Sequence, residues 1–291
     1  MVTDSKIFLY DNKYSIHYHD TGSGEPIVFV HGLGAASYGW RFISESLVKK
    51  YRLVSLDLRG FGMSDKPTKS IYSLKHHAEV LIALIQHLNL RNITVVGHSL
   101  GGAVVLTAYL VLSLNLSKEH NVKSLVLMDA LAYRYKIPWY LLFFKIPVLN
   151  SLLINRYTIS FVISPILSRI GRKRLFFDER MVDDKMAKAY SGYIRQDGAQ
   201  YALVRTMEQT TPQSLDAISN ELTNINIPVL VLWGEHDKAL PVSLGEKLNS
   251  DISGSKWVVI KDCGHNPHEE CPSETANAIL SFLNNLENQH D

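Results

Sequence analysis

A serine flanked by glycines, between a strand-like and a helix-like segment, constrains this chain most. Gly97-His98-Ser99-Leu100-Gly101 follows a short β-branched run over 92–96 and precedes a run of small residues over 102–108. The first run is typical of a buried strand and the second of a helix. A turn this tight excludes bulky side chains two positions before and after the serine. The pattern therefore predicts a strand–turn–helix unit that presents Ser99 at the carboxyl end of a strand.

Two further strand-like runs are each followed by a residue that could assist this serine. A serine hydroxyl needs a base to become a nucleophile, and the base needs an orienting acid. Asp237 follows the apolar run 227–234, and His265 lies in the loop after the run 256–260. The carboxyl ends of parallel strands meet at one edge of a sheet, so we expect Ser99, Asp237 and His265 to lie together there.

Strand-like and helix-like segments alternate along most of the chain. This alternation predicts the α/β class, with a mostly parallel, doubly wound sheet and helices on both faces. His17 and His19 alternate on one expected strand and are predicted to face solvent. The other expected elements are a hairpin of 6–11 and 14–20, a strand at 26–30, a helix at 40–50, a strand at 51–56, a helix at 74–90 after Ser73 as N-cap, a strand at 122–129 and a final helix at 273–286.

Five motifs in this order resemble the α/β-hydrolase family, over nearly the whole chain. They are HGLG at 31–34, DLRGFGMSD at 57–65, the Ser99 turn, GEHD at 234–237 and GHNPHEECP at 264–272. The resemblance implies an α/β-hydrolase fold in which Ser99 is the nucleophile, His265 the base and Asp237 the acid.

The resemblance also implies an oxyanion hole formed by the backbone N–H groups of Leu33 and Leu100. Some members of the family place the acid where this chain has Asp129, at the end of the strand after the Ser99 helix, so that alternative stays open. We expect no metal ion and no cofactor.

The segment from 132 to 213 breaks the alternation and is inserted between two core strands. We predict a core of 1–131 and 214–291 and a helical cap of 132–213, which in this family covers the active site. Its first half is very apolar and supplies Trp139, Leu142 and Phe143 as candidate substrate-binding residues. Trp40, after the oxyanion loop, is another candidate, with packing in the core as the alternative.

The cap segment also carries the positive charge of the chain. The formal net charge is +2, yet no acidic residue lies between Asp129 and Asp178. Eight basic residues lie there: Arg134, Lys136, Lys145, Arg156, Arg169, Arg172, Lys173 and Arg174. Three explanations compete: helix packing, an apolar substrate pocket, and peripheral contact with an anionic membrane. The near-neutral charge and the absence of a binding motif argue against nucleic acid, and uncharged runs of only about 12 residues argue against a spanning helix.

The expected function is hydrolysis of carboxylic esters of a fairly apolar small-molecule substrate through an acyl-enzyme. The first alternative is carbon–carbon bond hydrolysis of aromatic ring-cleavage products, whose enzymes commonly carry tryptophan where this chain has Asn266. The second is a ligand receptor with a vestigial hydrolase site. Two cysteines and an amino-terminal start without an apolar segment predict a cytoplasmic location. The oligomeric state stays open.

Overall fold

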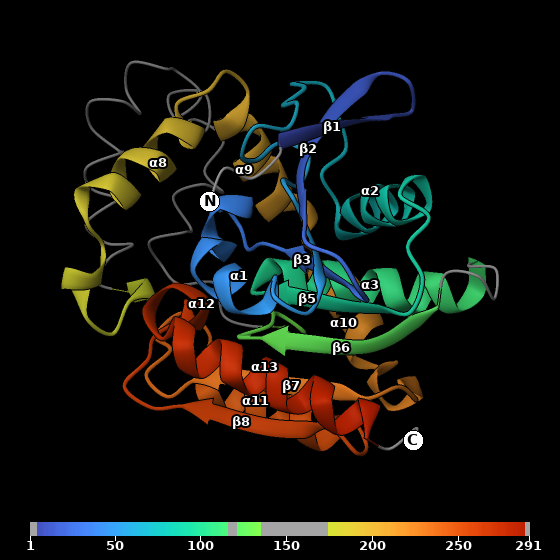
Figure 1. The fold of residues 1–291 in the computed structure, drawn as a ribbon. Helices are drawn as coiled ribbons and strands as arrows, with labels where there is room; N and C mark the ends of the chain where they lie inside the picture. The colour runs from blue at the N-terminus through green and yellow to red at the C-terminus, as the bar shows by residue number, and fades with distance from the viewer. Residues whose placement is uncertain (1–4, 116–120, 135–173, 289–291) are drawn as a thin grey trace.

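An eight-stranded sheet forms the centre of the computed structural model, which describes residues 5–115, 121–134 and 174–288 (Figure 1). The strand order is β1-β2-β4-β3-β5-β6-β7-β8. β1 and β4 each pair with β2 in antiparallel fashion, and all other pairs are parallel. The strands are β1 (Ser5–Tyr10), β2 (Tyr14–Thr21), β3 (Pro26–Val30), β4 (Arg52–Leu56), β5 (Ile93–His98), β6 (Val122–Met128), β7 (Val229–Gly234) and β8 (Lys256–Ile260). The predicted α/β class with a mostly parallel sheet is confirmed.

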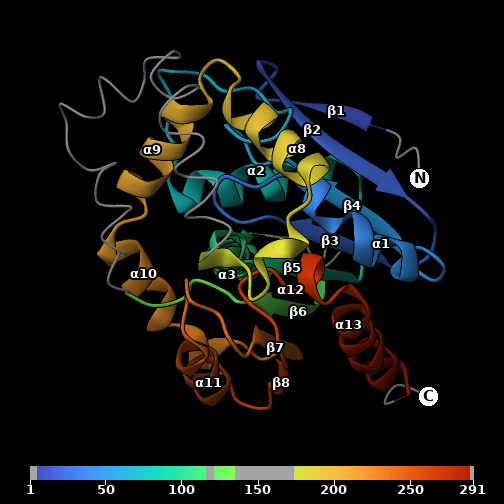
Figure 2. The ribbon, with the colours of Figure 1, turned by 90° about the vertical axis from the view of Figure 1, so that its left-hand side faces the viewer.

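Helices cover both faces of this sheet. Figure 2 shows α1 and α13 on one side and α2, α3 and α11 on the other. The helices are α1 (Arg41–Leu47), α2 (Leu74–His87), α3 (Leu100–Asn115), α8 (Asp184–Ile194), α9 (Ala199–Gln209), α10 (Pro212–Ser219), α11 (Val242–Asp251), α12 (Pro267–Glu270) and α13 (Pro272–Glu287). Short 3-10 turns lie at Ser37–Trp40, Glu179–Met181 and Leu222–Asn224.

The central strands are apolar on both faces because each face packs against helices. In β7, Val229, Val231 and Trp233 belong to the cluster formed with α2, α3 and α11. Leu230 and Leu232 of the same strand belong to the cluster formed with α1 and α13. Because side chains alternate between the two faces along a strand, one continuous apolar run contributes side chains to the cores on both sides of the sheet.

The ends of α2 follow local chemistry. The Ser73 side chain accepts a hydrogen bond from the His76 N–H and caps the start of the helix, as predicted. The helix ends at His87 and not at Leu90, because Asn89 takes a left-handed φ of +46° that asparagine tolerates and a helix does not.

The chain between β6 and β7 contributes α8, α9 and α10. Figure 1 places α8 beyond the carboxyl ends of the parallel strands, where the cap was predicted. The predicted boundary between 213 and 214 falls inside α10, whose Leu215 and Ile218 pack into the core cluster that includes α3. α10 therefore belongs structurally to the core.

Several predicted features lie outside the described residues. They are the candidate substrate-binding residues Trp139, Leu142 and Phe143, and six of the eight basic residues of the cap segment. Within the described part of the chain, no helix is long and apolar enough to cross a membrane.

Candidate active site

Ser99 sits at a sharp turn between β5 and α3. Its φ of +52° is a conformation that residues other than glycine rarely adopt. A Cβ at Gly97 would lie 2.7 Å from the Gly101 carbonyl oxygen, and a Cβ at Gly101 would lie 2.2 Å from the Val30 carbonyl oxygen. Only glycine fits at either position, so the sequence pattern around Ser99 follows from backbone crowding.

The structure brings Ser99, His265 and Asp237 into one hydrogen-bonded line, which we call the triad. The Ser99 Oγ lies 3.0 Å from His265 Nε2, and His265 Nδ1 lies 2.6 Å from Asp237 Oδ2. His265 and Asp237 are only 5% and 7% exposed. In this geometry the Nδ1–H donates to the carboxylate, which leaves Nε2 free to accept the serine proton.

Hydrogen bonds keep the Asp237 carboxyl ionised despite its burial. Burial alone would raise the pKa of Asp237, but the neighbouring His265 and the backbone N–H groups of Leu240 and Ala239 lower it overall. Those two N–H groups donate to Oδ1 at 2.9 and 2.7 Å, while Oδ2 faces the histidine. The alternative acid, Asp129, instead accepts from the backbone N–H of Gly234.

The two residues predicted to form the oxyanion hole, Leu33 and Leu100, lie next to Ser99 in the chain or in space. Leu100 begins α3, so its N–H has no acceptor within the helix. Among the described residues, neither this N–H nor that of Leu33 donates a hydrogen bond to another group. A Cβ at Gly32 would lie 3.1 Å from the Ser99 Cβ, so the Leu33 loop runs directly beside the serine.

A buried histidine fixes the loop that carries Leu33. His31 Nε2 accepts from the Leu58 N–H at 3.0 Å, so its Nδ1–H donates to the Gly32 carbonyl oxygen at 2.7 Å. Burial lowers the pKa of His31, which keeps the ring neutral and preserves this tautomer.

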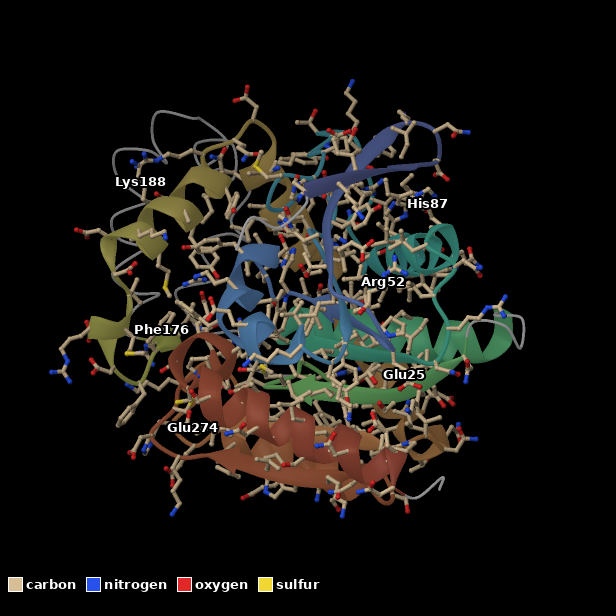
Figure 3. All side chains as sticks on the ribbon, in the orientation of Figure 1. Glu25, Arg52, His87, Phe176, Lys188 and Glu274 are labelled. Atoms are coloured by element: carbon tan, nitrogen blue, oxygen red, sulfur yellow. The ribbon has the colours of Figure 1, made fainter. Side chains whose placement is uncertain are left out.

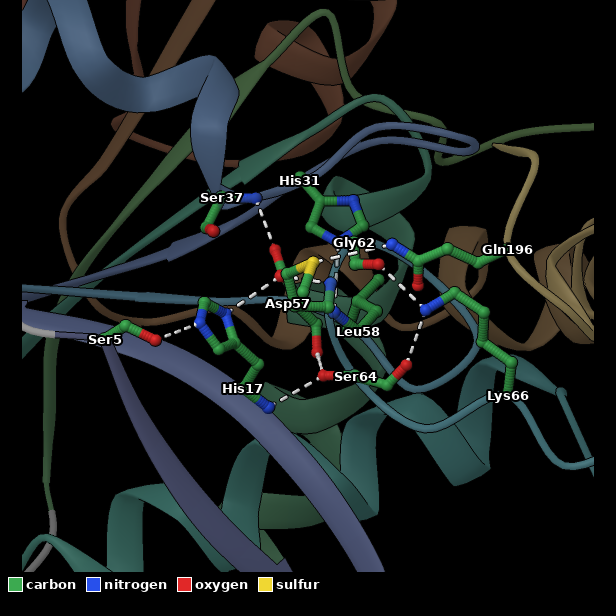
Figure 4. A network of polar contacts seen from close by, with 11 residues as sticks. Ser5, His17, His31, Ser37, Asp57, Leu58, Gly62, Ser64, Lys66 and Gln196 are labelled. Carbon is green, nitrogen blue, oxygen red and sulfur yellow. Dashed lines mark hydrogen bonds and ion pairs between the residues drawn. The ribbon is translucent and has the colours of Figure 1, made fainter. Parts of the chain in front are cut away.

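Asp57 anchors the neighbouring loop in a polar network (Figure 4). Its carboxylate accepts from the backbone N–H groups of Ser37 at 2.6 Å and Met63 at 2.8 Å, and from His17 Nδ1 at 3.0 Å. Burial opposes this charge, but the hydrogen bonds from His17 and the backbone lower the pKa of Asp57 to about 2. The prediction that His17 faces solvent is therefore wrong, because its ring turns inward to this carboxylate.

Glu270, a residue whose role the sequence did not suggest, supports the loop that carries His265. Its carboxylate accepts from the backbone N–H groups of Phe177 at 2.7 Å, Gly264 at 3.1 Å and Asn266 at 3.1 Å. Figure 3 labels the adjacent, buried Phe176 at this junction between the inserted segment and α12. One carboxylate thus joins the inserted segment to the base loop.

The carbonyl oxygen of Leu175 adds to this support. It accepts from the His265 N–H at 2.9 Å and from the Asn266 side-chain amide at 3.1 Å. The inserted segment therefore hydrogen-bonds directly to the backbone of the candidate base.

Helix α8 is docked on the core through the neighbouring Glu269. Its carboxylate accepts hydrogen bonds from the Tyr190 hydroxyl at 3.0 Å and from the Arg41 guanidinium at 2.6 Å. Burial raises the pKa of Glu269, although the interactions with Arg41 and Tyr190 lower it in part. The Arg41 guanidinium also stacks over the Tyr38 ring at 4.0 Å from its centre.

Comparison with known proteins identifies the family of this chain. A sequence model of the alpha/beta hydrolase fold matches residues 25–272. The chain belongs to the α/β-hydrolase family. It is 30% identical to the 2-hydroxy-6-oxo-6-(2'-aminophenyl)hexa-2,4-dienoic acid hydrolase of Metapseudomonas resinovorans, over 91% of this chain and 86% of that protein. It is 27% identical to an uncharacterized hydrolase, YugF, of Bacillus subtilis, over 94% of both chains.

Solved structures agree on the fold of this α/β hydrolase. An alpha/beta hydrolase fold protein from Burkholderia ambifaria superimposes with a TM-score of 0.82 at 23% identity, covering 95% of this chain and 97% of that one. At this identity the likeness concerns the fold alone.

An apolar pocket of this α/β hydrolase lies between the oxyanion loop and the inserted helices. Tyr193 and Ile194 of α8 and Leu203 of α9 face Gly34 and Phe61 across it. No charged side chain lines the pocket among the described residues.

Trp40, predicted as a candidate substrate-binding residue, lies in the core of the α/β hydrolase. It is 1% exposed and packs against Phe29 and His268, with ring centres 5.0 and 4.5 Å away. This placement favours the packing alternative.

Metal-binding side chains gather in two places in the described part of the chain. Asp129 lies with Asp237 and His265, and the exposed Glu235, His236 and Asp262 form a second group. Asp237 and His265 of the first group are engaged in the triad, and the second group is open to solvent, so we assign a metal to neither.

Proposed function

We propose that this α/β hydrolase is a serine esterase that cleaves carboxylic esters of an apolar substrate through an acyl-enzyme. The observation that carries the proposal is the triad, in which the Ser99 hydroxyl lies 3.0 Å from His265 Nε2. The two unpaired backbone N–H groups of Leu33 and Leu100 support it, because they are donors of the kind that stabilise a developing oxyanion.

The chemistry follows from these positions. Ser99 Oγ attacks the ester carbonyl carbon while His265 Nε2 takes the serine proton. The imidazolium that forms is stabilised by the Asp237 carboxylate at 2.6 Å, and the oxyanion accepts hydrogen bonds from the two N–H groups. His265 then returns the proton to the leaving alcohol. Water, activated by the same nitrogen, attacks the acyl-enzyme and releases the acid and free Ser99.

The nucleophile is tested by replacement of Ser99 with alanine. The wild-type protein should react with a fluorophosphonate probe at Ser99 alone. Ser99→Ala should lose all labelling and reduce turnover of p-nitrophenyl esters by on the order of 10⁶-fold, because no other group can form the acyl-enzyme.

Ser191→Ala, a change on α8, is the matched control and should keep both activities. Labelling of another serine, or turnover by Ser99→Ala near the wild-type rate, would contradict the assignment.

The apolar side chains that α8 and α9 place against the loop of Gly34 support an apolar acyl or alcohol group in the substrate. Each buried methylene contributes about 0.8 kcal/mol, which is roughly fourfold in kcat/KM when expressed in the transition state. We expect kcat/KM to rise from acetate to medium-chain p-nitrophenyl esters and then to level off. Leu203→Ala, which shortens a lining side chain, should flatten the rise and leave the acetate rate in place. A higher kcat/KM of the wild-type protein for the acetate ester than for longer esters would contradict the proposal of an apolar substrate.

Carbon–carbon bond hydrolysis is the second candidate, supported by the relative whose name gives a hexadienoic acid as its substrate. A direct comparison decides: turnover of a ring-cleavage dienoate with kcat/KM above that of every ester would replace the esterase proposal. Slow single-turnover hydrolysis of both substrates would instead favour a ligand receptor with a vestigial site.

A cytoplasmic location and a peripheral membrane contact are further proposals. The two free cysteines, Cys263 and Cys271, support the first. The acid-free basic stretch of sequence supports the second, although Arg134 is already paired with Asp216. Exposed charges are screened within about 10 Å at 0.1 M salt, so binding to phosphatidylglycerol vesicles should fall with salt. Absence of vesicle binding at low salt would withdraw the membrane contact.

A further inference from the structure

The carboxyl group of Asp129 is buried beside the triad, and the mechanism above gives it no role. Asp129 directly follows β6, is 0% exposed and holds a left-handed φ of +43°. Its Oδ1 accepts the Gly234 N–H at 2.9 Å. Its Oδ2 has no hydrogen-bond partner among the described residues. A carboxyl oxygen of Asp129, one of Asp237 and a ring nitrogen of His265 lie within 4.8 Å of one another.

Two carboxyl groups this close in a buried site do not both carry a negative charge. Hydrogen bonding decides which of them keeps the proton. Asp237 accepts three hydrogen bonds, from His265 and two backbone N–H groups, whereas Asp129 accepts one. Burial, followed by the charge of Asp237, raises the pKa of Asp129 well above its ordinary value. The proton therefore stays on Asp129.

A protonated carboxyl oxygen is a hydrogen-bond donor, and the carboxylate of Asp237 is close enough to interact with the side chain of Asp129, whose Oδ2 is unpaired among the described residues. We propose that Asp129 is a neutral carboxylic acid that donates a hydrogen bond from Oδ2 to the Asp237 carboxylate, and so is a positioning residue for the triad. The effect on rate rests on the proposed function, but the protonation state of Asp129 does not.

The proposed hydrogen bond holds Asp237 in place and offsets part of its charge. When alkali removes the proton from Asp129, two carboxylates face each other and the support of Asp237 is lost. The other ionisable groups that face this pair among the described residues are His98, His265, Glu270 and Cys263. The activity of the wild-type protein should therefore fall at alkaline pH as Asp129 ionises.

Infrared difference spectroscopy tests the protonation state without any assay of turnover. At pH 7 in D₂O, the wild-type protein should show the C=O stretching band of a buried carboxylic acid, and Asp129→Asn should lack it. Asp20→Asn is the control, because hydrogen bonds from Arg52 and Lys6 lower the pKa of Asp20 and keep it ionised. Wild-type and Asp129→Asn spectra that are identical in this region would overturn the proposal.

The pH profile of kcat/KM tests the positioning role. Asparagine can still accept a hydrogen bond from Gly234 and donate one to Asp237, but it cannot ionise. The kcat/KM of Asp129→Asn should therefore no longer fall at alkaline pH, and its kcat should be about threefold lower than that of the wild type. Leucine has no donor, so Asp129→Leu should lower kcat about 10- to 100-fold and move the acid limb of the profile, with KM little changed.

An Asp129→Leu protein that stays folded by circular dichroism and has the wild-type pH profile would overturn the role. If the wild-type protein turns over no ester, the esterase proposal fails and the infrared result alone decides the state of Asp129.

Discussion

At the scale of single residues, the short contact between His265 Nδ1 and Asp237 Oδ2 favours Asp237 over Asp129 as the acid that orients the base. Asp237→Asn should reduce kcat by about 10⁴-fold, because an amide stabilises the wrong histidine tautomer and cannot balance the imidazolium charge. Asp129→Asn should cost only about threefold, because Asp129 acts through Asp237. Steady-state hydrolysis of a p-nitrophenyl ester by both variants, with circular dichroism as the folding control, measures the difference. The reverse order of effects would move the acid to Asp129.

The triad residues were predictable because each lies in a short motif that follows a strand. The supports of the triad were not. Glu270 reaches Phe177 across 93 positions, and Asn266 reaches the Leu175 carbonyl across 91. No local pattern encodes a hydrogen bond between such distant segments. Trp40 illustrates the same limit, because the sequence could not decide between the pocket and the core.

At the scale of elements, the long buried strands and amphipathic helices were predictable, and the helices α11 and α12 were not. Strands such as β7 present one apolar run, and α2 repeats its apolar residues at helical spacing behind a capping serine. α12 has four residues, and its Pro267 occupies the first helical position, where proline is tolerated. α11 buries only Gly245 and Leu248, too few for a periodic signal.

The attachment of α8 to the core yields a prediction about stability. Tyr190→Phe removes a hydroxyl that donates to the buried Glu269 at 3.0 Å. The free energy of unfolding should fall by about 1.5–3 kcal/mol, the range for a hydrogen bond to a charged group. Tyr193→Phe is the matched control on the same helix, because its hydroxyl has no hydrogen-bond partner in the described part of the chain. Urea unfolding curves measure both, and equal destabilisation by the two changes would refute the docking role.

At the scale of the whole molecule, four buried histidines should make the fold sensitive to acid. Burial lowers the pKa of His31 and His268, and lowers that of His77 and His98 to about 3. In the unfolded chain these rings bind protons near pH 6.5. Their contribution to stability is therefore complete above pH 6.5 and is lost as pH falls below it, down to about pH 3 for His77 and His98. His77 and His98 each lower the free energy of unfolding by about 1.4 kcal/mol per pH unit in that window.

Urea midpoints at pH 7, 6 and 5 measure this loss. His77→Leu should reduce the slope of unfolding free energy against pH by about 1.4 kcal/mol per unit. His87→Leu, at an exposed position of α2, is the control and should keep the wild-type slope. A slope that His77→Leu leaves unchanged would show that this ring does not contribute.

The hydrogen bonds of Glu270 and His265 to residues 175–177 also set a rule for building chimeras. A chimera that exchanges the inserted segment with that of a relative transplants part of the backbone scaffold of the base, unless its downstream joint lies before Leu175. With the joint before that residue, the recipient keeps its own residues 175–177 and the pocket side chains of α8 and α9. With the joint after Phe177, the donor supplies residues 175–177. The donor residues must then hydrogen-bond Glu270 and His265 in the same way, or the chimera will hold His265 in the wrong position.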